Sequence, residues 1–190
     1  MMLWWIARAT SLVALVLLTL TLALGIAAGA GRPQTRVLVQ AVHRNASMLA
    51  VVLIGMHVAT LVVDPHVDLG LVDLLVPFGS EFHRVATGLG TIALDLVITV
   101  AVTSALRTRL GGRTWRAVHA LAYAMWPIAA LHGLGAGTDV VAVRWLTVAC
   151  AAVVGMGVAW RLTRARSRTA SVLAVAGLAV TGALAGVVLA

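Results

Sequence analysis

Four histidines lie inside apolar stretches of this 190-residue chain, in two pairs with nearly equal spacing. His43 and His57 are 14 residues apart, and His119 and His132 are 13 residues apart. An ionisable side chain is costly to place inside a membrane, so each of these histidines is a candidate functional residue. Imidazole is a common axial ligand of haem iron, and two matched pairs predict ligands for two haems.

The composition indicates a membrane protein with several spans. Hydrophobic residues make up 62% of the chain and charged residues only 11%, and the mean hydropathy is +1.05. A soluble domain does not keep this much apolar surface from water, so we expect a lipid bilayer around the chain. The net charge of +8 comes from arginines in short runs between apolar stretches. That pattern is typical of membrane loops and argues against a nucleic-acid partner.

Six apolar stretches are each close to the ~20 residues that cross a bilayer. This predicts an all-α membrane protein, built as a six-transmembrane-helix bundle. The stretches cover residues 9–30, 38–63, 85–106, 117–136, 140–160 and 170–190. Residues 1–190 then form a single transmembrane domain, with a haem-binding core at about 38–160. The first stretch resembles a secretory signal, but its apolar run is longer than such signals have, so we expect a retained helix.

Arginine placement predicts the orientation of these helices. Eleven arginines fall between helices one and two or at the start of helix two, between helices three and four, or between helices five and six, and the positive-inside rule places them in the cytoplasm. They are Arg32, Arg36, Arg44, Arg107, Arg109, Arg113, Arg116, Arg161, Arg164, Arg166 and Arg168. We therefore expect both termini outside. All fourteen basic residues are arginine, a bias that we interpret as that of a GC-rich bacterium, so the expected location is a bacterial plasma membrane.

This orientation makes the second and fourth predicted helices parallel. His43 and His119 then lie at one depth near the cytoplasmic face, and His57 and His132 lie roughly 20 Å further out along the helices. A single histidine in a membrane helix is more often a hydrogen-bonding residue between helices, but two matched pairs favour haem ligation. Histidine at both axial positions leaves no site for oxygen on the iron, so the predicted chemistry is outer-sphere electron transfer.

The spacing fits the first pair better than the second. At 100° per residue, 14 residues return to within about 40° of the starting face, so His43 and His57 align. Thirteen residues leave His132 about 140° from His119 on an ideal helix. Pro127 lies between these two residues, and we expect it to kink or locally unwind the helix.

These residues resemble a known family, the ferric reductase-like transmembrane domain. His43-Arg44-Asn45 and Gly55-Met56-His57-Val58 are similar to its first ligand helix. Thr103-Ser104-Ala105-Leu106-Arg107, Trp115-Arg116-Ala117-Val118-His119-Ala120-Leu121-Ala122-Tyr123 and Leu131-His132-Gly133 are similar to its following parts. The family includes ferric-chelate reductases, the membrane half of NADPH oxidases and the haem subunit of a bacterial methionine sulfoxide reductase system. The resemblance covers about residues 1–160 and is greatest to small standalone bacterial members.

The resemblance implies transfer of single electrons across the membrane through two haem b groups. It pairs His43 with His119 and His57 with His132. Eukaryotic members continue into a flavin and nicotinamide domain, whereas these 190 residues contain no Gly-rich dinucleotide fingerprint. We therefore expect a separate electron donor, either a flavoprotein or the quinol pool. The expected electron acceptor is extracytoplasmic: ferric iron, a redox protein or oxygen.

Arg44 and Arg116 flank the inner histidine pair and are candidate cofactor-binding residues. A guanidinium pairs well with the propionate carboxylates of a haem. The same arginines also fit a role in setting topology, or in docking an acidic electron-donor protein.

Other polar residues have open alternatives. Asp95 lies mid-span, where it fits a proton relay, a hydrogen bond to a ligand imidazole, or a structural contact between helices. Proline and glycine residues predict a folded loop at about 64–84. In or beside that loop, His66 and His83 fit either a site for an incoming metal ion or solvated positions. The acidic residues of the loop are Asp64, Asp68, Asp73 and Glu81.

Two alternatives to the electron-transfer function stay open. One is a haem-binding membrane anchor subunit of a separate oxidoreductase, which has no acceptor site of its own. The other is a non-redox, proton-coupled transporter whose histidines relay protons. Both alternatives are compatible with the same predicted helices. Only cofactor content and turnover distinguish them from a probable ferric reductase-like oxidoreductase component.

Overall fold

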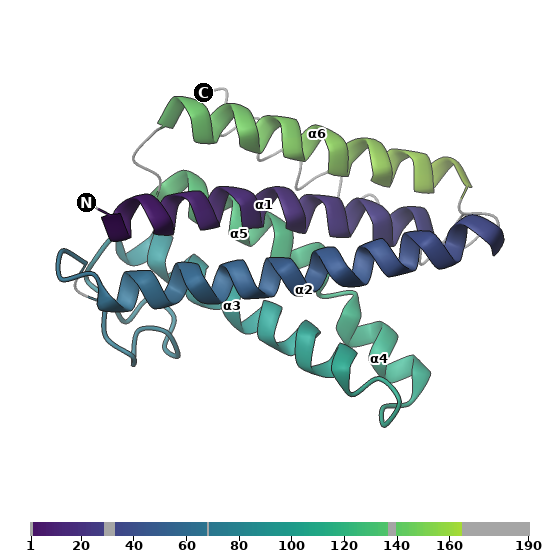
Figure 1. Cartoon of the computed structure of the whole chain (residues 1–190), viewed down its shortest axis with the longest axis horizontal. Coiled ribbons are helices and arrows are strands. Elements are labelled where there is room, and N and C mark those ends of the chain that lie inside the picture. The colour runs from purple at the N-terminus through teal and green to yellow at the C-terminus, as the bar shows by residue number, and fades with distance from the viewer. Residues whose placement is uncertain (1, 29–32, 68, 137–139, 165–190) are drawn as a thin grey trace. The chain divides into compact units, whose positions relative to one another are not determined.

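The computed structural model describes residues 2–28, 33–67, 69–136 and 140–164, and within these ranges it contains helices and no strand. The helices are α1 (Met2–Ala28), α2 (Pro33–Val63), α3 (Arg84–Ala105), α4 (Gly112–His119), α5 (Ala122–Ala136) and α6 (Val140–Arg164) (Figure 1). The prediction of an all-α protein is confirmed for the described part of the chain.

Five segments of the described chain are long and apolar enough to cross a membrane, which makes this a multi-pass membrane protein. They are Met2–Ala28, Thr35–Val63, Arg84–Ala105, Gly112–Ala136 and Val141–Arg161. The sixth predicted span, 170–190, lies outside the described residues. The first two helices begin earlier than predicted, at Met2 and Pro33. A proline at the first position of a helix costs little, because the N–H that it lacks has no partner there.

The chain divides into two compact units. Unit 1 comprises Met1–Ala14 and Val51–Thr138, and unit 2 comprises Leu15–Ala50 and Asp139–Ala190. Unit 1 therefore holds the start of α1, the end of α2 and all of α3, α4 and α5. Unit 2 holds the rest of α1, the start of α2 and α6.

Small side chains let α3 and α5 approach closely in unit 1. Ala86 on α3 and Ala130 on α5 are buried, and a Cβ built on Gly135 would lie 3.0 Å from the Cβ of Ala86. Trp126, also on α5, is 1% exposed. Membrane helices gain little from the hydrophobic effect, so close packing of this kind is what holds them together.

Unit 2 is built from α1 and α6 in a similar way. The buried apolar residues of α1 in this unit recur every three or four positions, and the buried residues of α6 likewise follow one face of that helix. They are Leu15, Leu18, Leu22 and Ile26 on α1, and Val143, Thr147, Cys150, Ala151, Val154 and Val158 on α6. A Cβ on Gly157 would lie 3.5 Å from Cδ1 of Ile26, which is ordinary van der Waals contact between the two helices. This spacing is that of one buried helix face.

The fourth predicted span is interrupted, and the interruption is not at Pro127. The chain leaves α4 at His119 and enters α5 at Ala122, and Pro127 is a buried residue inside α5. The expectation that Pro127 unwinds the helix is therefore wrong. A proline removes only the hydrogen bond to the carbonyl four residues earlier, here that of Tyr123, and α5 continues past that loss.

A tighter winding between α4 and α5 reduces the angle about the helix axis that separates His119 from His132. Leu121, Tyr123 and Ala124 each donate their backbone N–H to the carbonyl three residues earlier. Each residue wound three to a turn advances about 120° instead of 100°, so three such residues add about 60°. This winding alone lowers the angle about the helix axis between His119 and His132 from about 140° to about 80°.

The connection between α2 and α3 is a folded loop, as predicted, and it is attached to α3. The hydroxyl of Thr91 donates a hydrogen bond to the carbonyl of Asp73 at 2.9 Å. The ring of Phe78, a residue with a positive φ of 65°, occupies the space where a side chain on Gly88 would lie. Gly88 is buried, so the absence of a side chain at this position lets the loop close against the helix.

Candidate functional site

Burial along α2 places both of its histidines on one stripe. His43 and His57 are half-buried, and Ala50, midway between them, is 0% exposed. Flanking residues such as Met48 and Val52 are exposed by 63% and 58%. Buried or half-buried positions thus recur at the spacing of a single helix face, as the 14-residue separation predicts.

His57 and His132 lie together in unit 1, although α2 and α5 present them from distant parts of the sequence. Their ring centres are 6.3 Å apart, and the ring planes cross at 74°. If two imidazoles bind one metal ion through bonds of about 2 Å each, their ring centres lie about 6 Å apart. The observed separation therefore fits two axial ligands of one iron.

Both of these rings are oriented by backbone carbonyls. Nδ1 of His57 donates a hydrogen bond to the carbonyl of Ala7 at 2.9 Å, and Nδ1 of His132 donates one to the carbonyl of Ala86 at 2.7 Å. A carbonyl only accepts, so the proton of each neutral ring is on Nδ1 and the lone pair is on Nε2. Histidines that bind metals typically make this second hydrogen bond, which fixes the tautomer and the ring direction.

His43 has the same orientation in unit 2. Its Nδ1 donates a hydrogen bond to the carbonyl of Thr21 on α1, at 2.8 Å, so its proton is on Nδ1 as well. A Cβ on Gly25 would lie 3.5 Å from Cε1 of this ring, an ordinary contact. Three of the four predicted ligands therefore have Nδ1 bonded to a backbone carbonyl.

His119, in unit 1, has a different environment. Its ring stacks on that of Trp115, with 5.0 Å between centres and 25° between planes. The hydroxyl of Ser104 on α3 lies 3.3 Å from its Nδ1. His119 and His43 belong to different units, so their pairing stays a prediction.

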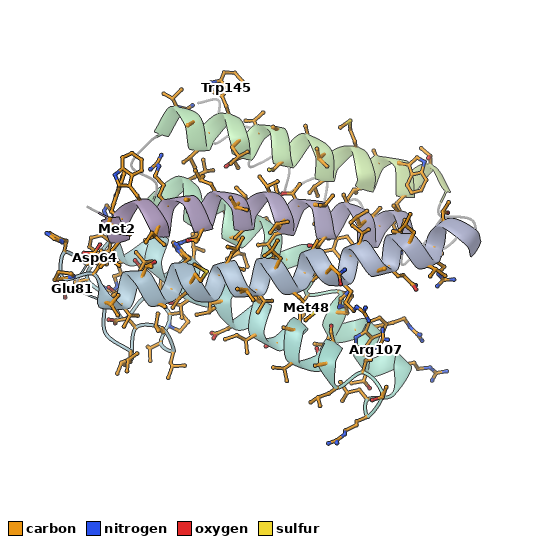
Figure 2. All side chains as sticks on the ribbon, viewed as in Figure 1. Met2, Met48, Asp64, Glu81, Arg107 and Trp145 are labelled. Atoms are coloured by element: carbon orange, nitrogen blue, oxygen red, sulfur yellow. The ribbon has the colours of Figure 1, made fainter. Side chains whose placement is uncertain are left out.

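The predicted arginine ligands are both at the surface. Arg44 of unit 2 and Arg116 of unit 1 are exposed, and their contact with haem carboxylates stays a prediction. Figure 2 shows Arg107 at one end of unit 1 and Asp64 and Glu81 at the other end. The arrangement follows the separation of basic and acidic loops read from the sequence.

Asp95 does not orient any of the four histidines. Each Nδ1 lies beside another group: the carbonyls of Thr21, Ala7 and Ala86 and the hydroxyl of Ser104. The expectation that Asp95 hydrogen-bonds a ligand imidazole is wrong for the described residues. Its side chain is exposed on α3.

The loop histidines do not form a metal site in the described part of the chain. No three His, Cys, Asp or Glu side chains of that part are grouped so that they could hold a metal ion. His66 instead binds Asp64, through its backbone N–H and through Nδ1, both 3.0 Å from Oδ1. Both hydrogen bonds hold the pKa of the Asp64 carboxyl below its ordinary value, and the bond from the backbone N–H has the larger effect.

Sequence reasoning did not identify the groups that orient the histidines. These groups are the backbone carbonyls of Ala7, Thr21 and Ala86. Every residue type has a backbone carbonyl, so nothing in the sequence marks these three. Gly90 is a second omission: a Cβ there would meet the ring of His132. A glycine inside an apolar helix is a weak signal of such a close approach.

The comparisons with known proteins identify one family. The family described as ferric reductase like transmembrane component matches residues 10–130, well over half of the chain. The match includes His43, His57 and His119 and ends just before His132. No curated protein and no solved structure matches the chain. The chain therefore belongs to the ferric reductase like transmembrane component family, whose domains generally bind haem and carry electrons across membranes.

Proposed function

We propose that this protein carries single electrons across a membrane through two b-type haems, each held by two histidines. His57 with His132 forms the outer site, and His43 with His119 forms the inner site. The observation that carries the proposal is the pair of imidazoles 6.3 Å apart, each with Nδ1 bonded to a carbonyl. Each Nδ1 bond joins two helices, but a contact that only joined helices would not require a second imidazole 6.3 Å away.

The residues of the chain prepare the outer site before any cofactor binds. The carbonyls of Ala7 and Ala86 hold both rings in the tautomer that has its lone pair on Nε2. Both rings are half-buried, which reduces the access of water that would compete for those lone pairs. When bound, a haem with two histidine ligands exchanges single electrons without binding a substrate at its iron. The site is therefore suited to electron transfer and not to oxygen activation at the metal.

The charge distribution supports a direction for the electrons. Arg107, Arg109, Arg113 and Arg116 are exposed in or beside the α3–α4 connection, and the positive-inside rule favours the cytoplasmic side for this end. Basic side chains attract an acidic donor protein and speed its encounter with the membrane protein. We propose a flavoprotein or quinol as donor at the basic side, and an acceptor such as ferric iron at the acidic side of Asp64 and Glu81.

Absorption spectra and haem stoichiometry of the purified full-length protein test the proposal. We expect a sharp low-spin b-type α-band after reduction with dithionite, and two haems per chain by pyridine haemochrome assay. His57→Ala and His132→Ala are each expected to lose the same haem, and His43→Ala and His119→Ala the other one. His66→Ala is the control, because His66 is an 82% exposed loop residue.

The alternatives give different results in the same experiments. A featureless spectrum of well-folded protein would overturn the proposal and favour a proton-coupled transporter. Two bound haems that are reduced by a donor but pass no electrons to ferric chelate or another acceptor across a liposome membrane would indicate an anchor subunit. Loss of a different haem in His57→Ala than in His132→Ala would contradict the pairing.

A further inference from the structure

Trp115 carries a polar group whose partner is not among the described residues. Its indole Nε1–H is buried and has no hydrogen-bond acceptor within residues 2–28, 33–67, 69–136 and 140–164. Buried polar groups in native proteins are nearly always bonded to protein, water or a ligand. An indole N–H only donates, so the partner of Trp115 is an acceptor atom.

The indole belongs to the surroundings of a candidate haem ligand. Trp115 and His119 are four residues apart in α4, which is about one helical turn. Their rings stack with 5.0 Å between centres and 25° between planes. The indole therefore covers one side of the imidazole ring and belongs to the immediate surroundings of any group that His119 would bind.

The charges near Trp115 indicate that the acceptor is an anion from outside this segment. Arg107, Arg109, Arg113 and Arg116 lie within eight residues of it and are exposed. The sequence contains no Asp or Glu between Asp95 and Asp139. A segment with this much positive charge and no carboxylate of its own is suited to binding an anionic oxygen.

We propose that the Nε1–H of Trp115 donates a hydrogen bond to a carboxylate of the haem bound through His119. Trp115 is then a cofactor-positioning residue of the inner site. The inference rests on the proposed function, in which His119 is a haem ligand. A lipid phosphate offers the same acceptor chemistry. The carboxylate is favoured because the N–H is buried beside His119, whereas the arginines that would meet lipid phosphates are exposed.

The test uses full-length wild-type protein and Trp115→Phe, each loaded with haem b or with haem b dimethyl ester, whose carboxylates are blocked. Phenylalanine keeps an aromatic ring beside His119 and removes the N–H. The rate of porphyrin loss to an excess of apomyoglobin is measured for each combination. Trp145→Phe is the matched control, since Trp145 is an exposed tryptophan on α6 (Figure 2).

We expect Trp115→Phe to lose one of its two haems about tenfold faster than the wild type does, which is the size of effect of one hydrogen bond to a charged group. We expect the same substitution to leave the loss of the dimethyl ester unchanged, and Trp145→Phe to change neither rate. Equal acceleration for haem and ester overturns the proposal, because Trp115 would then act by packing alone. Unchanged rates for both porphyrins overturn it as well.

Repeating the measurement in nanodiscs of zwitterionic or anionic phospholipid separates the two acceptors. An effect of Trp115→Phe that requires anionic lipid, and is the same for haem and ester, assigns the acceptor to a lipid phosphate and overturns the proposal. Wild-type protein that binds no haem overturns the proposed function and this inference with it. Haem-loaded wild type with an unaffected Trp115→Phe variant overturns this inference alone.

Discussion

Gly90 lies against the imidazole of His132, so closely that a Cβ on Gly90 would come within 2.7 Å of both Cε1 and Nδ1 of the ring. Real Cβ atoms do not approach other atoms to this distance. The ring cannot move without losing the hydrogen bond between its Nδ1 and the carbonyl of Ala86. Gly90 on α3 is therefore required for the position that His132 of α5 takes opposite His57.

We predict that Gly90→Ala displaces His132 and reduces the haem content from two per chain to about one, with the outer haem lost. Haem stoichiometry and the α-band of the reduced protein measure the effect. Gly133→Ala is the matched control, because Gly133 is next to His132 in sequence but nothing lies within 4 Å of the position of its Cβ. Full haem content in Gly90→Ala would show that the ring position is not needed for binding.

The relation between His57 and His132 could be predicted from sequence, but its support could not. Topology predicted that His57 and His132 lie at one depth, and the family resemblance implied their pairing, whereas the 13-residue spacing alone did not predict the direction of His132. The carbonyls of Ala7 and Ala86 that fix these rings leave no mark in the sequence, since every residue has a carbonyl. Gly90 is recognisable only once α3 is known to pack on α5.

The break between α4 and α5 shows a second limit of sequence reasoning. Pro127 was the obvious residue to interrupt the helix, yet the structure bends at Ala120 and Leu121 instead. Neither residue type favours a helix end, so local propensity carries no signal there. The tighter winding seen in the hydrogen bonds of Leu121, Tyr123 and Ala124 could therefore not be predicted from the sequence of this segment.

Asp95→Asn is predicted to leave the haem spectra, the haem stoichiometry and the electron-transfer rate within error of the wild type. The side chain of Asp95 is exposed on α3 and does not orient any of the four histidines within the described residues. Asparagine has nearly the same shape without the charge, so it tests the carboxylate alone. A lower rate with unchanged spectra would instead assign a proton-relay role to Asp95.

Gly88→Ala is predicted to destabilise the loop between α2 and α3. The ring of Phe78 occupies the space that the added methyl group needs, and overpacking of this kind typically costs about 1–3 kcal/mol. We expect a lower melting temperature and faster proteolysis between residues 69 and 83. Gly55→Ala serves as control, because its Cβ position is open and alanine favours a helix by about 0.5–1 kcal/mol. Equal proteolysis of both variants would contradict the role of Gly88.

Acid is predicted to destabilise the loop between α2 and α3 through Asp64. Its carboxyl accepts hydrogen bonds from the backbone N–H and from Nδ1 of His66, which lower its pKa in the folded protein. The unfolded chain then takes up a proton at about pH 4 while the folded chain does not, so the stabilisation is complete above that pH and is lost as the pH falls through the folded pKa. Melting temperatures measured between pH 7 and pH 3 report this loss.

Two variants divide the effect of Asp64 between its two partners. Asp64→Asn should remove most of the fall in melting temperature between pH 7 and pH 3 (the acid limb), because the group that titrates is gone. His66→Ala should keep most of the acid sensitivity, since the backbone N–H of residue 66 is the larger cause of the lowered pKa and survives the substitution. If His66→Ala flattens the acid limb as fully as Asp64→Asn does, the imidazole and not the backbone carries the interaction. The loop would then be held by a side-chain pair that changes with the charge of His66, rather than by the fold of the loop itself.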